Sequence, residues 1–135
     1  MNTVFIVDDE STIRQGLKCI IEWDKLGFEI IGEAANGKDA LTFILQNNPD
    51  VVMLDIRIPK LSGLEVAEQA RQKGYQGKII ILSGFSDFKY AQEAIRHGVE
   101  YYLTKPIDED ELTETIQTIG EKYESLVKPA GCKRA

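Results

Sequence analysis

The sequence is poor in the residues that build disulfide frameworks, zinc sites and membrane spans. Its 135 residues include two cysteines, Cys19 and Cys132, whose spacing matches neither a disulfide framework nor a zinc site. No apolar run approaches the roughly 20 residues that cross a bilayer, and Met1-Asn2-Thr3 lacks the basic start of a secretory signal. These absences lead us to expect one cytoplasmic domain without a membrane partner.

Positive charge is also scarce. The chain has 16 basic and 22 acidic residues, a net charge of −6. Three of the basic residues lie in the last eight positions, so residues 1–127 have 13 basic against 22 acidic residues, a net charge of −9. Because nucleic-acid binding depends on neutralising phosphates, we expect no direct binding of DNA or RNA by this chain. An excess of carboxylates suits a divalent cation better.

Apolar runs that suit buried strands alternate with helical patterns along the chain. The runs lie at residues 3–7, 28–35, 51–55, 78–82 and 101–103, and helical spacing of apolar residues follows at about 11–21, 40–45, 64–74, 87–98 and 108–123. This alternation predicts an α/β fold, a mostly parallel sheet covered on both faces. Periodicity ends at Val127, which predicts a domain over residues 1–126 and a linker or disordered tail over 127–135.

Polar residues follow four of the five predicted strands. Asp8 and Asp9 follow the first strand, Asp55 the third, Ser83 the fourth and Lys105 the fifth. Because the carboxyl ends of parallel strands share one edge, the three carboxylates would repel one another unless a cation joined them. Oxygen ligands with open positions suit Mg²⁺, which also accepts phosphate oxygens. With a lysine and a hydroxyl beside them, they predict a phosphoryl-transfer site whose nucleophile is an aspartate.

Four motifs, taken together, resemble the receiver domain of two-component response regulators. They are Val7-Asp8-Asp9-Glu10, Leu54-Asp55-Ile56-Arg57-Ile58-Pro59, Leu82-Ser83-Gly84 and Leu103-Thr104-Lys105-Pro106. The resemblance covers about residues 2–125 in matching order. It implies a doubly wound (βα)5 fold, flavodoxin-like or CheY-like, with a parallel sheet of strand order 2-1-3-4-5.

The resemblance also implies a metal site and a phosphoacceptor. Asp55 is expected to accept a phosphoryl group from a phosphohistidine on a sensor histidine kinase. Mg²⁺ is expected at Asp8, Asp9, Asp55 and the backbone carbonyl of Arg57, with Asp9 as a direct ligand and Asp8 acting largely through water. The chain itself is then a regulatory phosphoacceptor and not an enzyme, although it assists its own phosphoryl transfer and dephosphorylation.

Further residues take roles in the response to phosphorylation. Ser83 is expected to bind a phosphate oxygen, Lys105 to pair with the phosphoryl group, and Tyr102 to be the aromatic switch residue whose ring turns inward. The Lys105-Pro106 bond is expected to be cis. In receivers the surface that responds comprises the fourth helix, fifth strand and fifth helix, here about residues 87–124, and it often forms a homodimer.

Two less general stretches, residues 21–28 and 82–91, resemble receivers fused to AraC-type helix-turn-helix output domains. No such domain lies within these 135 residues. We therefore expect a receiver from a longer transcription regulator, which would reach DNA through that missing domain. A stand-alone receiver is the alternative.

Other functions fit the sequence less well. A magnesium-dependent phosphatase with an aspartyl nucleophile typically carries Asp-x-Asp, and Asp55-Ile56-Arg57 lacks the second acid. Residues 32–39 fit the first seven positions of a nucleotide-binding P-loop, but Asp39 stands where Ser or Thr is required. The single histidine, His97, precedes a glycine at a predicted helix end, where a cation complements the helix dipole. The phosphohistidine must therefore come from a partner.

The lifetime of the phosphoaspartate depends, in receivers, on the second residue after the acceptor and the second after the hydroxyl residue. Here these are Arg57 and Phe85. Such a long, bulky pair hinders the attacking water, which predicts slow loss of the phosphate.

Overall fold

The computed structural model describes residues 1–84 and 101–127, with side chains as far as Tyr123. The predicted helix at about 87–98, with His97, lies outside the described residues. So do Phe85 and residues 128–135 of the predicted tail.

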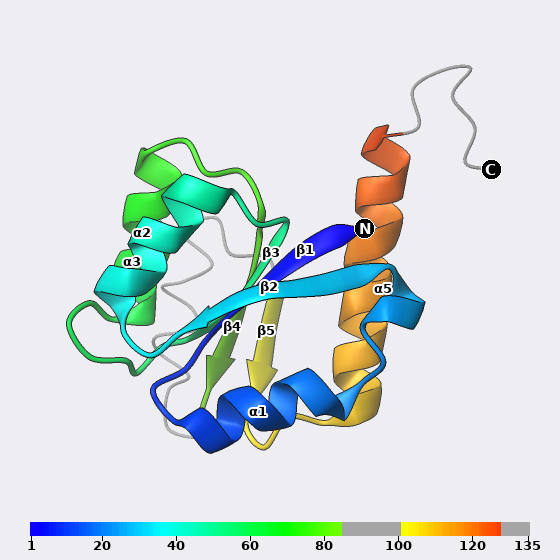
Figure 1. Ribbon diagram of the computed structural model, residues 1–135, viewed down its shortest axis with the longest axis horizontal. Coiled ribbons are helices and arrows are strands. Elements are labelled where there is room, and N and C mark those ends of the chain that lie inside the picture. The colour runs from blue at the N-terminus through cyan, green and yellow to red at the C-terminus, as the bar shows by residue number, and fades with distance from the viewer. Residues whose placement is uncertain (85–100, 128–135) are drawn as a thin grey trace.

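Five parallel strands form one sheet in the order β2-β1-β3-β4-β5 (Figure 1). The strands are β1 (Asn2–Val7), β2 (Phe28–Ala34), β3 (Val51–Asp55), β4 (Lys78–Ser83) and β5 (Tyr101–Thr104). This arrangement confirms the expected doubly wound α/β fold and its strand order. The strand that follows β1 in the chain lies on one side of it, and β3 lies on the other, so the order in which strands join the sheet reverses at β1 and β3. Val7 pairs with Leu54 in these two parallel strands, so the residues that follow emerge side by side.

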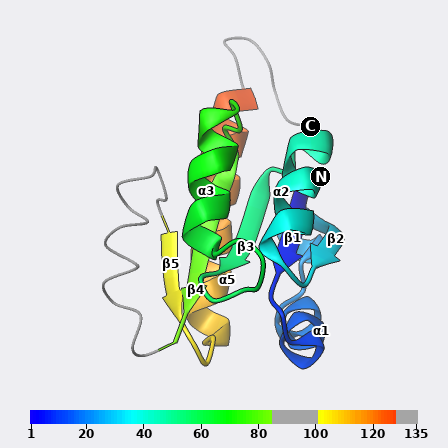
Figure 2. The same ribbon diagram turned by 90° about the vertical axis from the view of Figure 1, so that its left-hand side faces the viewer.

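Helices cover both faces of the sheet. Helices α1 (Ser11–Ile20) and α5 (Glu109–Val127) pack on one face, and α2 (Gly37–Asn47) and α3 (Gly63–Gln72) pack on the other (Figures 1 and 2). A short 3-10 helix, η1 (Asp24–Leu26), joins α1 to β2. None of the described helices is long and apolar enough to cross a membrane.

Three central strands, β1, β3 and β4, contribute alternate side chains to two hydrophobic clusters. In β1, Val4 and Ile6 pack with α1 and α5, whereas Phe5 and Val7 pack with α2 and α3. All five residues of β3 are buried. A strand covered on both faces needs apolar side chains at successive positions, which explains the continuous run at residues 51–54.

Capping side chains fix where α3 and α5 begin, and so where the loops before these helices end. A capping box begins α3: the Glu65 amide donates to Ser62 Oγ over 3.2 Å, and the Ser62 amide donates to Glu65 Oε1 over 3.3 Å. At the start of α5, the Glu111 amide donates to Asp108 Oδ2 over 2.8 Å. These caps give the loops at the carboxyl ends of the strands defined lengths.

Candidate functional site

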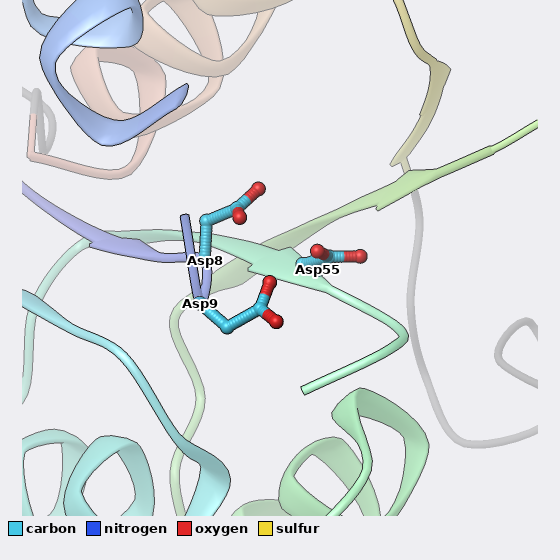
Figure 3. A group of neighbouring side chains, drawn as sticks. All are labelled: Asp8, Asp9 and Asp55. Atoms are coloured by element: carbon cyan, nitrogen blue, oxygen red, sulfur yellow. The ribbon is translucent and has the colours of Figure 1, made fainter. Parts of the chain in front are cut away.

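Three carboxylates meet where β1 and β3 end. Asp8 and Asp9 follow β1, and Asp55 is the last residue of β3 (Figure 3). One carboxylate oxygen from each residue lies within 4.8 Å of the others. Asp8 is 0% exposed and Asp55 is 5% exposed, whereas Asp9 faces solvent. Two of the three carboxylates are therefore buried, and the third is open to solvent.

Lys105 reaches the cluster from the far edge of the sheet. Its Nζ donates to Asp8 Oδ2 over 2.8 Å and to Asp55 Oδ2 over 3.0 Å. Its backbone amide donates to the Ser83 carbonyl over 2.8 Å, which extends the pairing of β5 with β4. The Lys105–Pro106 bond is cis, as expected. One ammonium group thus links the ends of β1, β3 and β5.

Burial and charge act on the acids in opposite directions. Burial raises the pKa of Asp55, the hydrogen bond and charge of Lys105 lower it, and the charge of Asp8 raises it again; the net direction is upward. Burial alone would lower the pKa of Lys105, but its bonds to Asp8 and Asp55 outweigh burial and raise it. Lys105 therefore stays protonated and favours the ionised form of Asp55.

The donor set fits a magnesium ion. All three clustered side chains offer carboxylate oxygen, and Asp9 leaves solvent access for the water molecules that Mg²⁺ retains. The ammonium of Lys105 offsets one of the three negative charges, so a divalent cation offsets the rest. The fourth expected ligand, the Arg57 carbonyl, belongs to the loop after β3, where the Arg57 amide donates to Asp55 Oδ1 over 3.2 Å.

Ser83 and Tyr102 contact each other beside the cluster. Ser83 ends β4 with 0% exposure, and its Oγ donates to the Tyr102 hydroxyl over 2.5 Å. The Tyr102 ring is partly buried against the core cluster that includes Val7 and Leu54. The two residues assigned to the response are therefore already joined by a hydrogen bond.

Two glycines confine the loop that follows Asp55. The Gly37 amide donates to the Pro59 carbonyl over 3.0 Å, and the Gly63 amide donates to the Ile56 carbonyl over 2.8 Å. A Cβ on Gly37 would overlap the Leu61 carbonyl oxygen, and a Cβ on Gly63 would overlap the Asp55 carbonyl oxygen. Backbone segments approach closely here because neither residue has a side chain.

Sequence reasoning assigned no role to Arg14, which the structure brings to the site. Its Nη1 donates to the Asp8 carbonyl over 2.7 Å. The available signal was position: Arg14 lies in the first turn of α1, and long side chains on a helix lean toward its N-terminus. A basic residue there reaches back to the acidic loop that precedes the helix.

Comparison with known proteins gives one family. A family model described as the response regulator receiver domain matches residues 4–117. Among curated proteins, the transcriptional regulatory protein YesN of Bacillus subtilis is 37% identical over 119 residues, which are 88% of this chain and 32% of YesN. The transcriptional regulatory protein HptR of Staphylococcus aureus is 40% identical over 112 residues, which are 83% of this chain and 44% of HptR. The chain thus spans less than half the length of these relatives.

Solved structures agree with this match. The REC domain of AraT, a response regulator from Geobacillus stearothermophilus, aligns with a TM-score of 0.87 and 38% identity, over 92% of this chain and 96% of that one. A two-component transcriptional regulator AraC from Clostridium phytofermentans aligns with a TM-score of 0.83 and 30% identity, over 93% and 97% of the two chains.

Proposed function

This chain belongs to the response regulator receiver family, and we propose that its Asp55 accepts a phosphoryl group from the phosphohistidine of a sensor histidine kinase, with Mg²⁺ held by Asp8, Asp9, Asp55 and the Arg57 carbonyl. The observation that carries the proposal is the buried Asp55 carboxylate, 3.0 Å from Lys105 Nζ and clustered with two further acids. A carboxylate in this setting has the positive partner and the ion site that phosphoryl transfer needs.

The transfer makes one bond and breaks one. An Asp55 carboxylate oxygen attacks phosphorus and forms a P–O bond, while the P–N bond to the kinase imidazole breaks and the imidazole keeps the electron pair. Lys105 favours the ionised nucleophile before transfer and binds a phosphoryl oxygen after it. Mg²⁺, when bound, offsets negative charge on the phosphoryl oxygens. The Ser83 hydroxyl donates to another of them.

The added charge biases a two-state surface through Ser83 and Tyr102. Within the described residues that surface comprises β5 and α5, and it serves as a homodimer interface in the active form. The protein is a regulatory domain and not a classical enzyme; its assistance to dephosphorylation is slow because Arg57 hinders water at Asp55.

The output of the switch is transcription. The curated relatives YesN and HptR are named transcriptional regulatory proteins and extend well beyond the matched region. A DNA-binding domain of AraC type, outside these residues, supplies the contact with DNA, and the protein works in the cytoplasm beside its kinase and its genes.

A small-molecule acyl phosphate replaces the kinase in the test. With Mg²⁺, the wild type is expected to gain one acid-labile phosphoryl group, visible by intact-protein mass spectrometry, and Asp55→Asn is expected to gain none. Asp24→Asn, which changes an exposed carboxylate on η1, is the matched control and keeps full labelling. Undiminished labelling of Asp55→Asn contradicts the assignment, and sustained hydrolysis of a phosphomonoester favours a phosphatase instead.

A further inference from the structure

Every polar atom of Asp8 has a partner. Its amide donates to the Ala34 carbonyl over 3.1 Å, its Oδ1 accepts from the Glu10 amide over 2.9 Å, and its Oδ2 accepts from Lys105. The remaining atom, the backbone carbonyl oxygen, accepts from Arg14 Nη1 over 2.7 Å. Of the four partners, Arg14 is the one that comes from a helix beside the site.

Arg14 is itself held in place. Its Nε donates to Glu33 Oε1 over 2.7 Å, and Glu33 belongs to β2. The Arg14 side chain is 15% exposed. One guanidinium therefore ties the start of α1 to two neighbouring strands, at the end of β1 and near the end of β2. Its planar fork of donors fixes both bonds at once.

We infer that Arg14 is a positioning residue for the metal-binding loop Asp8-Asp9, an inference that rests on the proposed function. A peptide group is planar, so the direction of the Asp8 carbonyl sets the direction in which the chain enters Asp9. The structure describes no hydrogen bond to the exposed Asp9 carboxylate, so its direction depends on the backbone that precedes it. Arg14 thus sets the direction of the Asp9 carboxylate, the proposed metal ligand that faces solvent.

Lys18 provides a matched control within the same cluster. It pairs with Oε2 of the same Glu33, one helical turn after Arg14, and carries the same charge. Among the described residues, Lys18 makes no hydrogen bond or ion pair with Asp8. If Arg14 acted on Mg²⁺ through charge alone, removing either cation would strengthen binding of the ion. If Arg14 acts through the Asp8 carbonyl, removing Arg14 weakens Mg²⁺ binding, whereas removing Lys18 does not.

The test compares Mg²⁺ affinity in the whole chain by isothermal titration calorimetry, without a phosphodonor. Arg14→Gln is expected to weaken Mg²⁺ binding by about tenfold, the lower range for residues that orient metal ligands. Lys18→Gln is expected to bind Mg²⁺ at least as tightly as the wild type. At saturating Mg²⁺, the phosphorylation rate of Arg14→Gln returns to near the wild-type value, which a general structural defect would not allow.

A second pair keeps the charge. Arg14→Lys retains the positive charge but loses the fork that reaches both Asp8 and Glu33, so it is expected to weaken Mg²⁺ binding, whereas Lys18→Arg leaves it unchanged. The positioning role is overturned if Arg14→Gln binds Mg²⁺ as tightly as Lys18→Gln, and Arg14→Lys as tightly as Lys18→Arg. This holds even if Asp55 is phosphorylated. Failure of Asp55 to accept phosphate overturns the proposed function separately, whatever Arg14→Gln does to Mg²⁺. A wild type without affinity for Mg²⁺ overturns both.

Discussion

The two ends of the parallel strands differ in how their acidic groups are paired. At the amino ends of the strands, a single acid, Asp50, accepts hydrogen bonds from several donors. Its Oδ2 accepts from the Thr3 amide over 2.8 Å and from Thr3 Oγ1 over 3.2 Å. Its backbone carbonyl accepts from the Lys78 amide and from the Tyr123 hydroxyl. Donors and acceptors match there, and the contacts join β1, β3, β4 and α5.

At the carboxyl ends of the strands, three negatively charged carboxylates lie around one positively charged donor. Lys105 bonds to Asp8 and Asp55 while Asp9 adds a third carboxylate nearby. Burial raises the pKa of Asp55 at this edge. The comparison indicates that one edge holds the fold together and the other gives up stability for binding and chemistry.

The largest effect is expected from Asp8→Asn at the carboxyl edge. Loss of a metal ligand should slow Mg²⁺-dependent phosphorylation by at least about a hundredfold. In Mg²⁺-free buffer the same change should raise the free energy of unfolding by about 1 kcal/mol, because it removes repulsion between two buried carboxylates. Stopped-flow phosphorylation and urea unfolding, followed by fluorescence of the buried Trp23, measure the two quantities. If Asp8→Asn lowered the free energy of unfolding instead, the carboxyl ends would stabilise the fold as the amino ends do, and the contrast would fail.

A smaller effect, of the opposite kind, is expected from Asp50→Ala at the amino edge. The change removes the acceptor of two hydrogen bonds from Thr3 and should lower the free energy of unfolding by about 2 kcal/mol. The phosphorylation rate of the folded protein should stay within about twofold of the wild type, since the site lies at the other end of the strands. Asp50→Asn retains one acceptor and serves as the milder control. A large loss of phosphorylation in Asp50→Ala would show that the edges are not separate.

The smallest effect concerns Glu33, which lies near the boundary of the site. Hydrogen bonds from Lys18 and then from Arg14 hold the pKa of Glu33 below its ordinary value of 4.5. Its ion pairs therefore add stability above pH 4.5, and this stability is lost as pH falls through the lowered pKa. Glu33→Gln should lower stability at pH 7 by about 0.5–1 kcal/mol, as expected for partly exposed pairs. Thermal melts at pH 7 and near pH 3 should show the difference disappear in acid; a constant difference would contradict it.

Much of the fold follows from the sequence because it depends on local patterns. The run at residues 51–54 is apolar at every position, and the structure buries it on both faces. Ser62 and Glu65 are three residues apart, and they form the capping box that this spacing predicts. The strand order came instead from the resemblance, because alternation of strands and helices does not by itself specify which strands are neighbours.

What the sequence did not reveal are contacts between residues far apart in the chain. Asp50 follows Asn48-Pro49 and has the composition of a turn, yet it bonds to Thr3, 47 positions away. The contact of Arg14 with Asp8 depends on how α1 packs beside the end of β1, which no pattern in a single sequence reports. Residues after strands were easier to place because parallel strands bring their carboxyl ends to one edge.

The glycine contacts have a consequence for how the site responds to charge. Gly37 blocks movement of the loop after Asp55 toward α2, and Gly63 blocks movement back against the end of β3. Close-packed backbone resists compression, so we expect the loop to move little in these two directions when Asp55 gains charge. The two close contacts therefore leave the loop after Asp55 little freedom to shift toward either neighbouring segment.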